Sequence, residues 1–206
     1  MRIKSRIWVL TGLWMAIPLF AATHQGGAYV GVDGGWSIPS SVPAPANYAT
    51  GNQNFTVGGT VGYQLPVGQK MATGVEANYT HFGQTSYSGN ASNNQASGSF
   101  KNSAIQVLLT GTYLMDNGFN TFVKIGAAHE QSSFNLDSNT MGVTGWIPAM
   151  AAGLGYALVK NLNLYAQYER TFGDNWDNAN AGSGGTPDSP VALNVLTMGV
   201  NYTLPM

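Results

Sequence analysis

Residues 191–204, VALNVLTMGVNYTL, carry a regular alternation of apolar and polar side chains close to the end of the chain. From Leu196 to Leu204 every second residue is apolar, and the residues between them are Thr197, Gly199, Asn201 and Thr203. A period of two residues is that of a β-strand with one apolar face. A terminal strand has an unpaired edge unless another strand covers it, and the first strand is its natural partner. The stretch therefore predicts a sheet that closes on itself.

The composition favours a membrane β-barrel over a soluble or helical membrane protein. Only 8% of the 206 residues are charged, whereas soluble domains carry about 25%. The mean hydropathy is nevertheless only -0.05, so the chain has no general excess of apolar residues. A β-barrel satisfies both observations because its lipid-facing residues occupy alternate positions. The length is sufficient for one all-β domain.

The basic start of the chain predicts a signal peptide over residues 1–21. An apolar run over 7–20 follows that start, and small residues allow cleavage after Ala21 or Ala22. The alternative is an uncleaved anchor, but the run is shorter than the ~20 apolar residues of a spanning helix. The barrel domain is then expected over 27–206.

Without the three basic residues of that segment, five basic residues face nine acidic ones. This balance does not suit nucleic acid as a partner. Cysteine is absent, which excludes a disulfide scaffold and cysteine-based metal or redox chemistry.

Seven further stretches show the same alternation, which gives eight predicted strands, an even number as in bacterial outer-membrane barrels. They are residues 28–36, 55–65, 71–82, 102–113, 119–130, 145–158 and 162–172.

The predicted connections alternate in length. The short ones are 66–70, 116–118 and 160–161, and the long ones are 38–54, 83–99, 131–144 and 173–190. This order places the short turns and both mature termini at the periplasmic mouth and four long loops outside. We therefore predict an all-β, eight-stranded, antiparallel up-and-down transmembrane β-barrel.

The chemistry of the two strand faces indicates which one meets lipid. The polar face carries mostly Gly, Thr, Asn and Gln, whereas a water-facing surface would carry many Lys and Glu side chains. Small polar residues suit the narrow lumen of an eight-stranded barrel. Aromatic residues lie toward strand ends on the apolar face, as lipid-facing girdles require. These are Trp36, Tyr63, Tyr79, Tyr113, Tyr156, Tyr168, Phe172 and Tyr202.

Several short motifs resemble the transmembrane domain of the outer membrane protein A (OmpA) family. They are GAYVG (27–31), GWS (35–37), GG (58–59), VGYQ (61–64), GVEANY (74–79) and AAGLGYA (151–157), with 165–174 and 196–204 similar in order and spacing. The resemblance covers about residues 27–204. It implies an eight-stranded barrel in the outer membrane of a Gram-negative bacterium, and it is specific for fold rather than for function.

Five charged residues are expected to point into the lumen by their parity in the strands. They are Asp33, Glu76, Lys124, Glu130 and Glu169. In the OmpA family, charged lumen residues form a salt-bridge gate, and the resemblance matches Glu76 and Lys124 to an acidic and a basic lumen position. Tyr165 stands where the family's gate has an arginine, so Glu76 needs Lys124 or another partner. We favour charges that simply fill the lumen; the alternative is a small, weakly conducting, cation-preferring pore gated by these residues.

The histidines after the predicted signal peptide do not indicate an enzyme. His24 lies near the new N-terminus, while His81 and His129 lie on two predicted strands separated by a third. Both face lipid by parity, so they cannot readily share a nucleophile or a metal. We predict no catalytic residue, no metal and no cofactor.

The predicted loops favour a structural or surface-interaction role such as adhesion or phage binding. They are neutral and rich in Asn, Ser and Gly, with Tyr87 and Trp176 as candidate anchors, and loops on a rigid scaffold often carry function. Arg170 faces outward near the outer rim, where it meets lipopolysaccharide phosphates in this interpretation. The expected partners are outer-membrane lipid, lipopolysaccharide, the barrel-insertion machinery and a host or phage surface ligand. The protein is expected to be a monomer.

The closing strand also resembles the C-terminal recognition strand of outer-membrane barrels. Thr197, Gly199, Tyr202 and Leu204 match its pattern of a polar residue, a glycine and two outward apolar residues. The family usually ends on an aromatic residue, whereas this chain has Leu204 followed by Pro205 and Met206. We expect insertion to proceed with Leu204 in that place.

Overall fold

The computed structural model describes six ranges of the chain, which are 26–39, 48–49, 54–89, 97–136, 139–173 and 189–205. The predicted signal peptide, His24 and Trp176 lie outside them, so those predictions stay untested. Within these ranges, no helix is long and apolar enough to cross a membrane.

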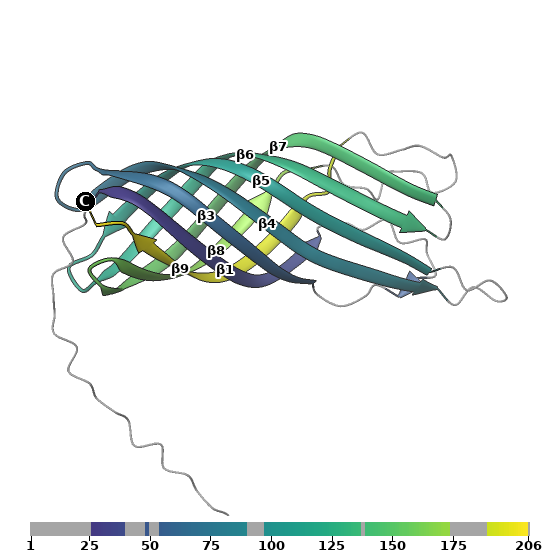
Figure 1. Cartoon of the computed structure of the whole chain (residues 1–206), viewed down its shortest axis with the longest axis horizontal. Coiled ribbons are helices and arrows are strands. Elements are labelled where there is room, and N and C mark those ends of the chain that lie inside the picture. Colours follow the sequence, from purple (N-terminus) through teal and green to yellow (C-terminus); the bar gives the residue numbers. More distant parts are fainter. Residues whose placement is uncertain are drawn as a thin grey trace, which may run out of the picture.

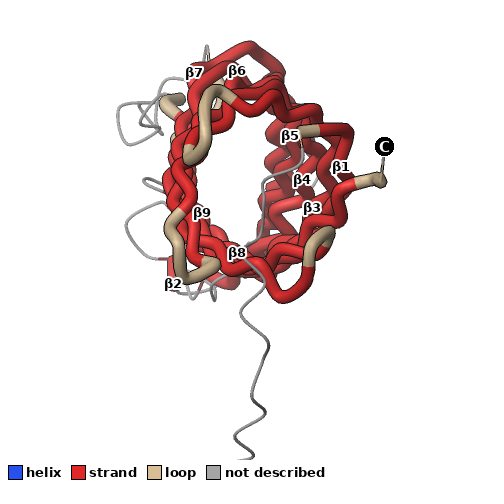
Figure 2. Tube along the Cα trace, turned by 90° about the vertical axis from the view of Figure 1, so that its left-hand side faces the viewer, coloured by secondary structure: helices blue, strands red, loops and turns tan. Residues whose placement is uncertain are grey.

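Eight long strands and one very short strand make up the described fold. Their bounds are β1 Gly27–Pro39, β2 Tyr48–Ala49, β3 Asn54–Pro66, β4 Met71–Gly89, β5 Ser97–Leu114, β6 Phe119–Leu136, β7 Asn139–Val159, β8 Leu162–Thr171 and β9 Leu193–Thr203. The long strands pair antiparallel in the order β4-β3-β1-β9-β8-β7-β6-β5, and pairing of β5 with β4 closes the ring. Figure 2 shows this closed ring from one end, and Figure 1 shows the tilted strands from the side. The predicted fold is confirmed.

The barrel is sealed by β9 and β1, as the terminal strand predicts. Val200 lies opposite Val32 and Leu196 opposite Trp36, and the backbone N–H of Leu204 donates to the carbonyl of Ala28 at 2.8 Å. The seam is tight, because a Cβ added at Gly35 would lie 1.9 Å from the Leu196 carbonyl oxygen. Glycine at this position lets the two backbones approach each other.

The apolar face of every long strand points away from the lumen. Met198 is 64% exposed and Val32 is 62% exposed, far above the values of buried core residues. The predicted girdle residues lie on the same outer face, with Trp36, Tyr63, Tyr79, Tyr113, Tyr168, Phe172 and Tyr202 all exposed and Tyr156 half-buried. A continuous exposed apolar surface is the lipid-facing band of a membrane barrel.

The four central strands reach well beyond the predicted ends, and two of the predicted loops are wrong in extent. Most of residues 83–99 and 131–144 belong to two long hairpins, β4–β5 and β6–β7 (Figure 1). Gly83 has φ +74° and the β4–β5 register shifts between His81 and Gln84. Such a bulge reverses which residues face inward, so the two-residue period is interrupted there.

The remaining connections differ less from prediction. Strand β2 lies inside the predicted loop 38–54 and pairs with Ser88 and Gly89 of β4. The three short turns join β3 to β4, β5 to β6 and β7 to β8 at the same end as the C-terminus (Figure 1). Two of these turns are linked by an exposed ion pair, with Lys70 Nζ 2.7 Å from Asp116 Oδ2.

Candidate functional site in the lumen

A buried ion pair lies inside the lumen. Lys124 Nζ on β6 lies 2.7 Å from Glu76 Oε1 and 2.9 Å from Glu76 Oε2 on β4. The Tyr29 hydroxyl on β1 donates to the same carboxylate at 2.7 Å. The two charged side chains are only 6% and 2% exposed. Lys124 is therefore the partner that Glu76 was predicted to need.

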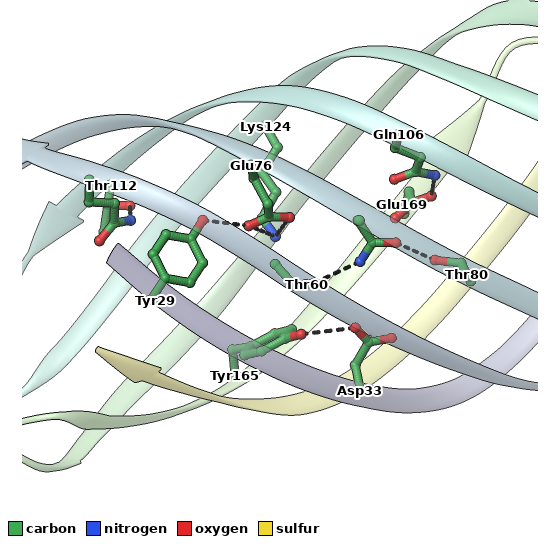
Figure 3. Close-up of polar contacts among 12 residues, drawn as sticks. Tyr29, Asp33, Thr60, Glu76, Thr80, Gln106, Thr112, Lys124, Tyr165 and Glu169 are labelled. Carbon is green, nitrogen blue, oxygen red and sulfur yellow. Dashed lines mark hydrogen bonds and ion pairs between the residues drawn. The ribbon is translucent and has the colours of Figure 1, made fainter. Parts of the chain in front are cut away.

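Two aromatic rings lie near this ion pair, and Figure 3 shows that of Tyr165. Lys124 Nζ lies 5.2 Å from the ring centre of Phe122 and 5.7 Å from that of Tyr165 on β8, within the range of cation–π attraction. The Tyr165 hydroxyl donates to Asp33 Oδ2 at 3.1 Å. Tyr165 thus contacts the cation through its ring and Asp33 through its hydroxyl. We call this set, Tyr29, Asp33, Glu76, Phe122, Lys124 and Tyr165, the charged belt.

The other two predicted lumen carboxylates are also buried but form a separate group. Gln106 donates to Glu169, and Asn102 donates to Glu130. The hydroxyls of Ser132 and Thr171 lie 3.4 Å from the Glu130 oxygens. Among the described residues, none of the contacts to these two carboxylates comes from a basic side chain. All five predicted residues therefore point inward, but the structure divides them between two sites.

An apolar cluster fills the outer part of the lumen, which differs from the predicted small and polar filling. Its members are inward-facing and buried: Phe82, Phe100, Ala104, Leu108, Ala128, Ile147, Ala149, Val191, Leu193 and Val195. The sequence pattern predicts part of this apolar cluster, because Leu108 and Ile147 occupy inward positions of two predicted strands. Close packing of apolar side chains leaves little room for water or ions.

A polar cavity of about 100 Å³ lies at the opposite end, near the short turns. Lys160 and Asn161 line its mouth, while Glu76 and Lys124 line its inner end. This volume holds several water molecules. The lumen is thus accessible as far as the charged belt from the short-turn end. Within the described residues, the belt and the apolar cluster close it at two successive levels.

The remaining candidate residues lie on the outer surface or in the closing strand. The His129 ring lies 5.0 Å from that of Trp146, and exposed His81 is separated from it by β5, since β4, β5 and β6 are consecutive neighbours. Arg170 lies over the Phe172 ring at 5.4 Å. No group of three or more His, Cys, Asp or Glu in the described part of the chain is arranged to hold a metal.

The four residues of the predicted recognition strand divide between the two faces of the sheet, two on each. Thr197 is buried and Gly199 half-buried, whereas Tyr202 and Leu204 are 43% and 45% exposed on the outer face. The side chain of Tyr87, a candidate loop anchor, lies outside the described side chains, although its backbone belongs to β4.

Known structures with the same architecture are outer-membrane barrels. OprG from Pseudomonas aeruginosa superposes with a TM-score of 0.55 at 14% identity, covering 91% of this chain and 100% of that chain. Neisserial surface protein A (NspA) gives a TM-score of 0.54 at 15% identity, covering 86% and 97%. Ail of Yersinia pestis, in complex with the heparin analogue sucrose octasulfate, gives 0.52 at 15% identity, covering 88% and 100%. At these identities the likeness concerns the fold alone.

Sequence comparison identifies the family directly. No sequence among the curated proteins matches this chain. The family model of the OmpA-like transmembrane domain, however, matches residues 23–204, which span all the described strands. This chain belongs to the OmpA-like transmembrane domain family.

Proposed function

We propose that this protein is a non-enzymatic outer-membrane barrel that acts at the cell surface through its outer hairpins and loops. The mature chain, released from a signal peptide over 1–21, has both termini in the periplasm in this proposal. The observation that carries it is a contrast between the lumen and the outer strands. The charged belt and the apolar cluster close the lumen, whereas the central strands continue far past the length needed to span the membrane. A closed lumen favours function at the outer surface over passage of solutes.

The strand lengths support the outer surface as the functional part. Strands β4 to β7 contain 19, 18, 18 and 21 residues, whereas β8 and β9 contain 10 and 11. A tilted membrane-spanning strand needs only about 9–11 residues. The surplus of roughly eight residues in each central strand extends ~25 Å at about 3.3 Å per residue. The two long hairpins are thus a rigid support for the connections they carry.

An anionic glycan of the host surface is the ligand class that we test first. Ail, which shares the fold, is seen in complex with the heparin analogue sucrose octasulfate, so a barrel of this fold is able to bind a polyanion. In this chain Lys101 lies exposed in the outer part of β5. Arg170 lies exposed at the outer end of β8. Lipopolysaccharide phosphates are the competing anionic partner of the same surface.

Shortened hairpins test the proposal in whole cells. One variant replaces Ser133–Gly142 by a two-residue turn, which is compatible with the register because these two residues pair directly in β6–β7. We expect cells with this variant to bind host cells or immobilised heparin several-fold less than cells with the full chain. The control shortens the periplasmic turn 116–118 by one residue. Equal binding by the shortened hairpin and the full chain, at equal surface amounts, contradicts the proposal.

The closing strand has a second proposed role, as the signal for membrane insertion. Thr197, Gly199, Tyr202 and Leu204 form the pattern, and the outward, exposed positions of Tyr202 and Leu204 support it. The insertion machinery is the partner of this strand. The protein is proposed to act as a monomer.

A further inference from the structure

We propose that the polar cavity at the short-turn end of the lumen is a binding site for a small neutral polyol, a molecule of the size of glycerol with several hydroxyl groups. The site is independent of the proposed role of the outer surface, because it lies at the opposite end of the barrel. It also differs from a pore, since the ligand enters and leaves by the same mouth. In the proposed topology this mouth opens to the periplasm.

Two buried oxygen atoms in the lining of this cavity lack a hydrogen-bond donor. Thr110 Oγ1 on β5 and Asn201 Oδ1 on β9 have no partner within the described part of the chain. The Thr110 side chain lies deep in the lumen, where the residue is only 4% exposed. Leaving a buried oxygen without a partner costs free energy. The cavity is the space from which a bound molecule supplies the missing donors.

A glycine beside each of these oxygens keeps that space open. Thr110 pairs with Gly74 of β4, and a Cβ added there would lie 3.0 Å from Thr110 Oγ1. Asn201 pairs with Gly31 of β1, where an added Cβ would collide with Asn201 Oδ1. Because glycine has no side chain, the neighbouring strand on that side offers each oxygen room but no side-chain donor.

The two oxygens lie on opposite walls of the lumen. In the ring of eight long strands, β5 and β9 are separated by three strands on either side. A layer of side chains fits between the walls of such a barrel, so a single hydroxyl group does not bridge them, whereas a short chain with hydroxyl groups at both ends does. The cavity of about 100 Å³ holds a molecule that replaces several waters.

The charges of the lining favour a neutral ligand. At the inner end, the charges of Glu76 and Lys124 cancel each other in the ion pair. Lys160, the other charged residue of the lining, is exposed at the mouth. The uncharged polar side chains are hydroxyls and amides, among them Thr112, Asn120 and Asn163. The inner end therefore selects neither a cation nor an anion.

Hydroxyl groups also suit the amides of the lining better than ionic groups do. The oxygen and nitrogen of a side-chain amide such as that of Asn201 exchange places when the amide turns by 180°, an orientation that heavy-atom positions do not define. A hydroxyl group both donates and accepts, so it fits either orientation, whereas an ammonium group only donates and a carboxylate only accepts. Apolar lining residues such as Leu114 and Phe122 contact the carbon atoms, as in most small-molecule sites.

Titration with glycerol, followed by NMR, tests the site in the full chain refolded into lipid nanodiscs. The side-chain amides of Asn163 and Asn201 report on the cavity, and ethanolamine and glycolate serve as a cation and an anion of similar size. We expect saturable shifts with glycerol and several-fold weaker binding of the two charged molecules. Thr110→Val removes the unpartnered hydroxyl at nearly constant side-chain size. It should raise the Kd for glycerol by about 5-fold, the loss of one ordinary hydrogen bond.

Thr56→Val is the matched control. Thr56 Oγ1 is likewise buried without a partner in the described part of the chain, but Thr56 does not line this cavity. Its variant should therefore keep the Kd of the wild type. Ala157→Leu narrows the cavity, because Ala157 belongs to the lining, and should weaken binding while Thr110 stays in place.

Each outcome distinguishes a specific site from a general solvent effect. Shifts that rise with glycerol without saturation, or tighter binding of ethanolamine or glycolate, overturn the proposal. Equal loss of affinity in Thr56→Val and Thr110→Val overturns it as well, because the effect is then nonspecific. The heat-dependent gel mobility of each variant establishes that it is folded. If Thr110→Val does not fold, saturation in the wild-type chain, the order of the three ligands and the Ala157→Leu variant still decide.

Discussion

Replacing Lys124 by Met should destabilise the barrel more than any other single substitution in the charged belt. Lys124 Nζ contacts both oxygens of the Glu76 carboxylate. The third contact of that carboxylate comes from the Tyr29 hydroxyl. Met has a similar length and fits beside the Phe122 ring, so the variant removes a charge without leaving a large cavity. Of the hydrogen bonds to Glu76 within the described part of the chain, the one from the Tyr29 hydroxyl then remains, and Glu76 is 3% exposed.

The expected magnitude follows from the burial of the pair. Removing one partner of a buried ion pair costs about 3–5 kcal/mol, because the remaining charge is left uncompensated. Replacing both partners by neutral groups is often nearly neutral. The double variant Glu76→Gln/Lys124→Met should therefore be more stable than Lys124→Met alone, and the coupling free energy of the cycle should be at least about 2 kcal/mol.

Equilibrium unfolding in guanidinium chloride measures these free energies. The refolded wild type, both single variants and the double variant are compared in the same lipid vesicles, by tryptophan fluorescence and by gel mobility without heating. A cost below about 1 kcal/mol for Lys124→Met, or a double variant whose cost equals the sum of the two single costs, refutes the account of the belt as a desolvated pair.

Three further results are expected. In planar bilayers the refolded protein should give no channel steps, because the belt and the apolar cluster close the lumen; frequent cation-preferring steps favour the pore instead. Tyr202→Asp or Leu204→Asp should lower the amount of protein inserted into the outer membrane of cells. The free energy of unfolding of the refolded protein should change by under about 1 kcal/mol, since both residues lie near the membrane interface. Unchanged insertion argues against the recognition signal. Gly35→Ala should lower the free energy of unfolding by about 1–3 kcal/mol through overpacking against β9. The control Gly59→Ala, with no atom within 4 Å of the new Cβ, should lower it little in the same unfolding assay. Equal losses in the two variants contradict the tight seam.

Alternation and turn chemistry predict the membrane-spanning part of this fold well. In this region each strand has one lipid-facing side and one lumen side, so the two-residue period survives along its whole length. The closing strand β9 is the clearest case, with outward Met198 beside inward Thr197. Parity alone also places Glu130 and Glu169 inside, although they lie far apart in the sequence.

The outer part of the barrel is not predictable in the same way. Residues 84–89 and 131–136, QTSYSG and QSSFNL, are mostly polar, so they have no sustained apolar period to indicate a strand. The bulge at Gly83 also shifts the inward face by one residue. Contacts across the lumen, such as Gln106 with Glu169, depend on strand stagger and barrel diameter, which the local pattern does not contain.

A cysteine cross-link across the closing seam tests the central claim most directly, because the natural chain contains no cysteine. Val32 and Val200 lie opposite each other on the outer face of β1 and β9, and paired strand residues are within reach of a disulfide. Oxidised Val32→Cys/Val200→Cys should therefore form an intramolecular disulfide while keeping the mobility of the folded barrel on unheated gels. The offset pair Val32→Cys/Leu196→Cys, about 13 Å apart along the strand, should not cross-link. Absence of the matched disulfide, or equal cross-linking of the offset pair, contradicts a barrel closed by its last strand in this register.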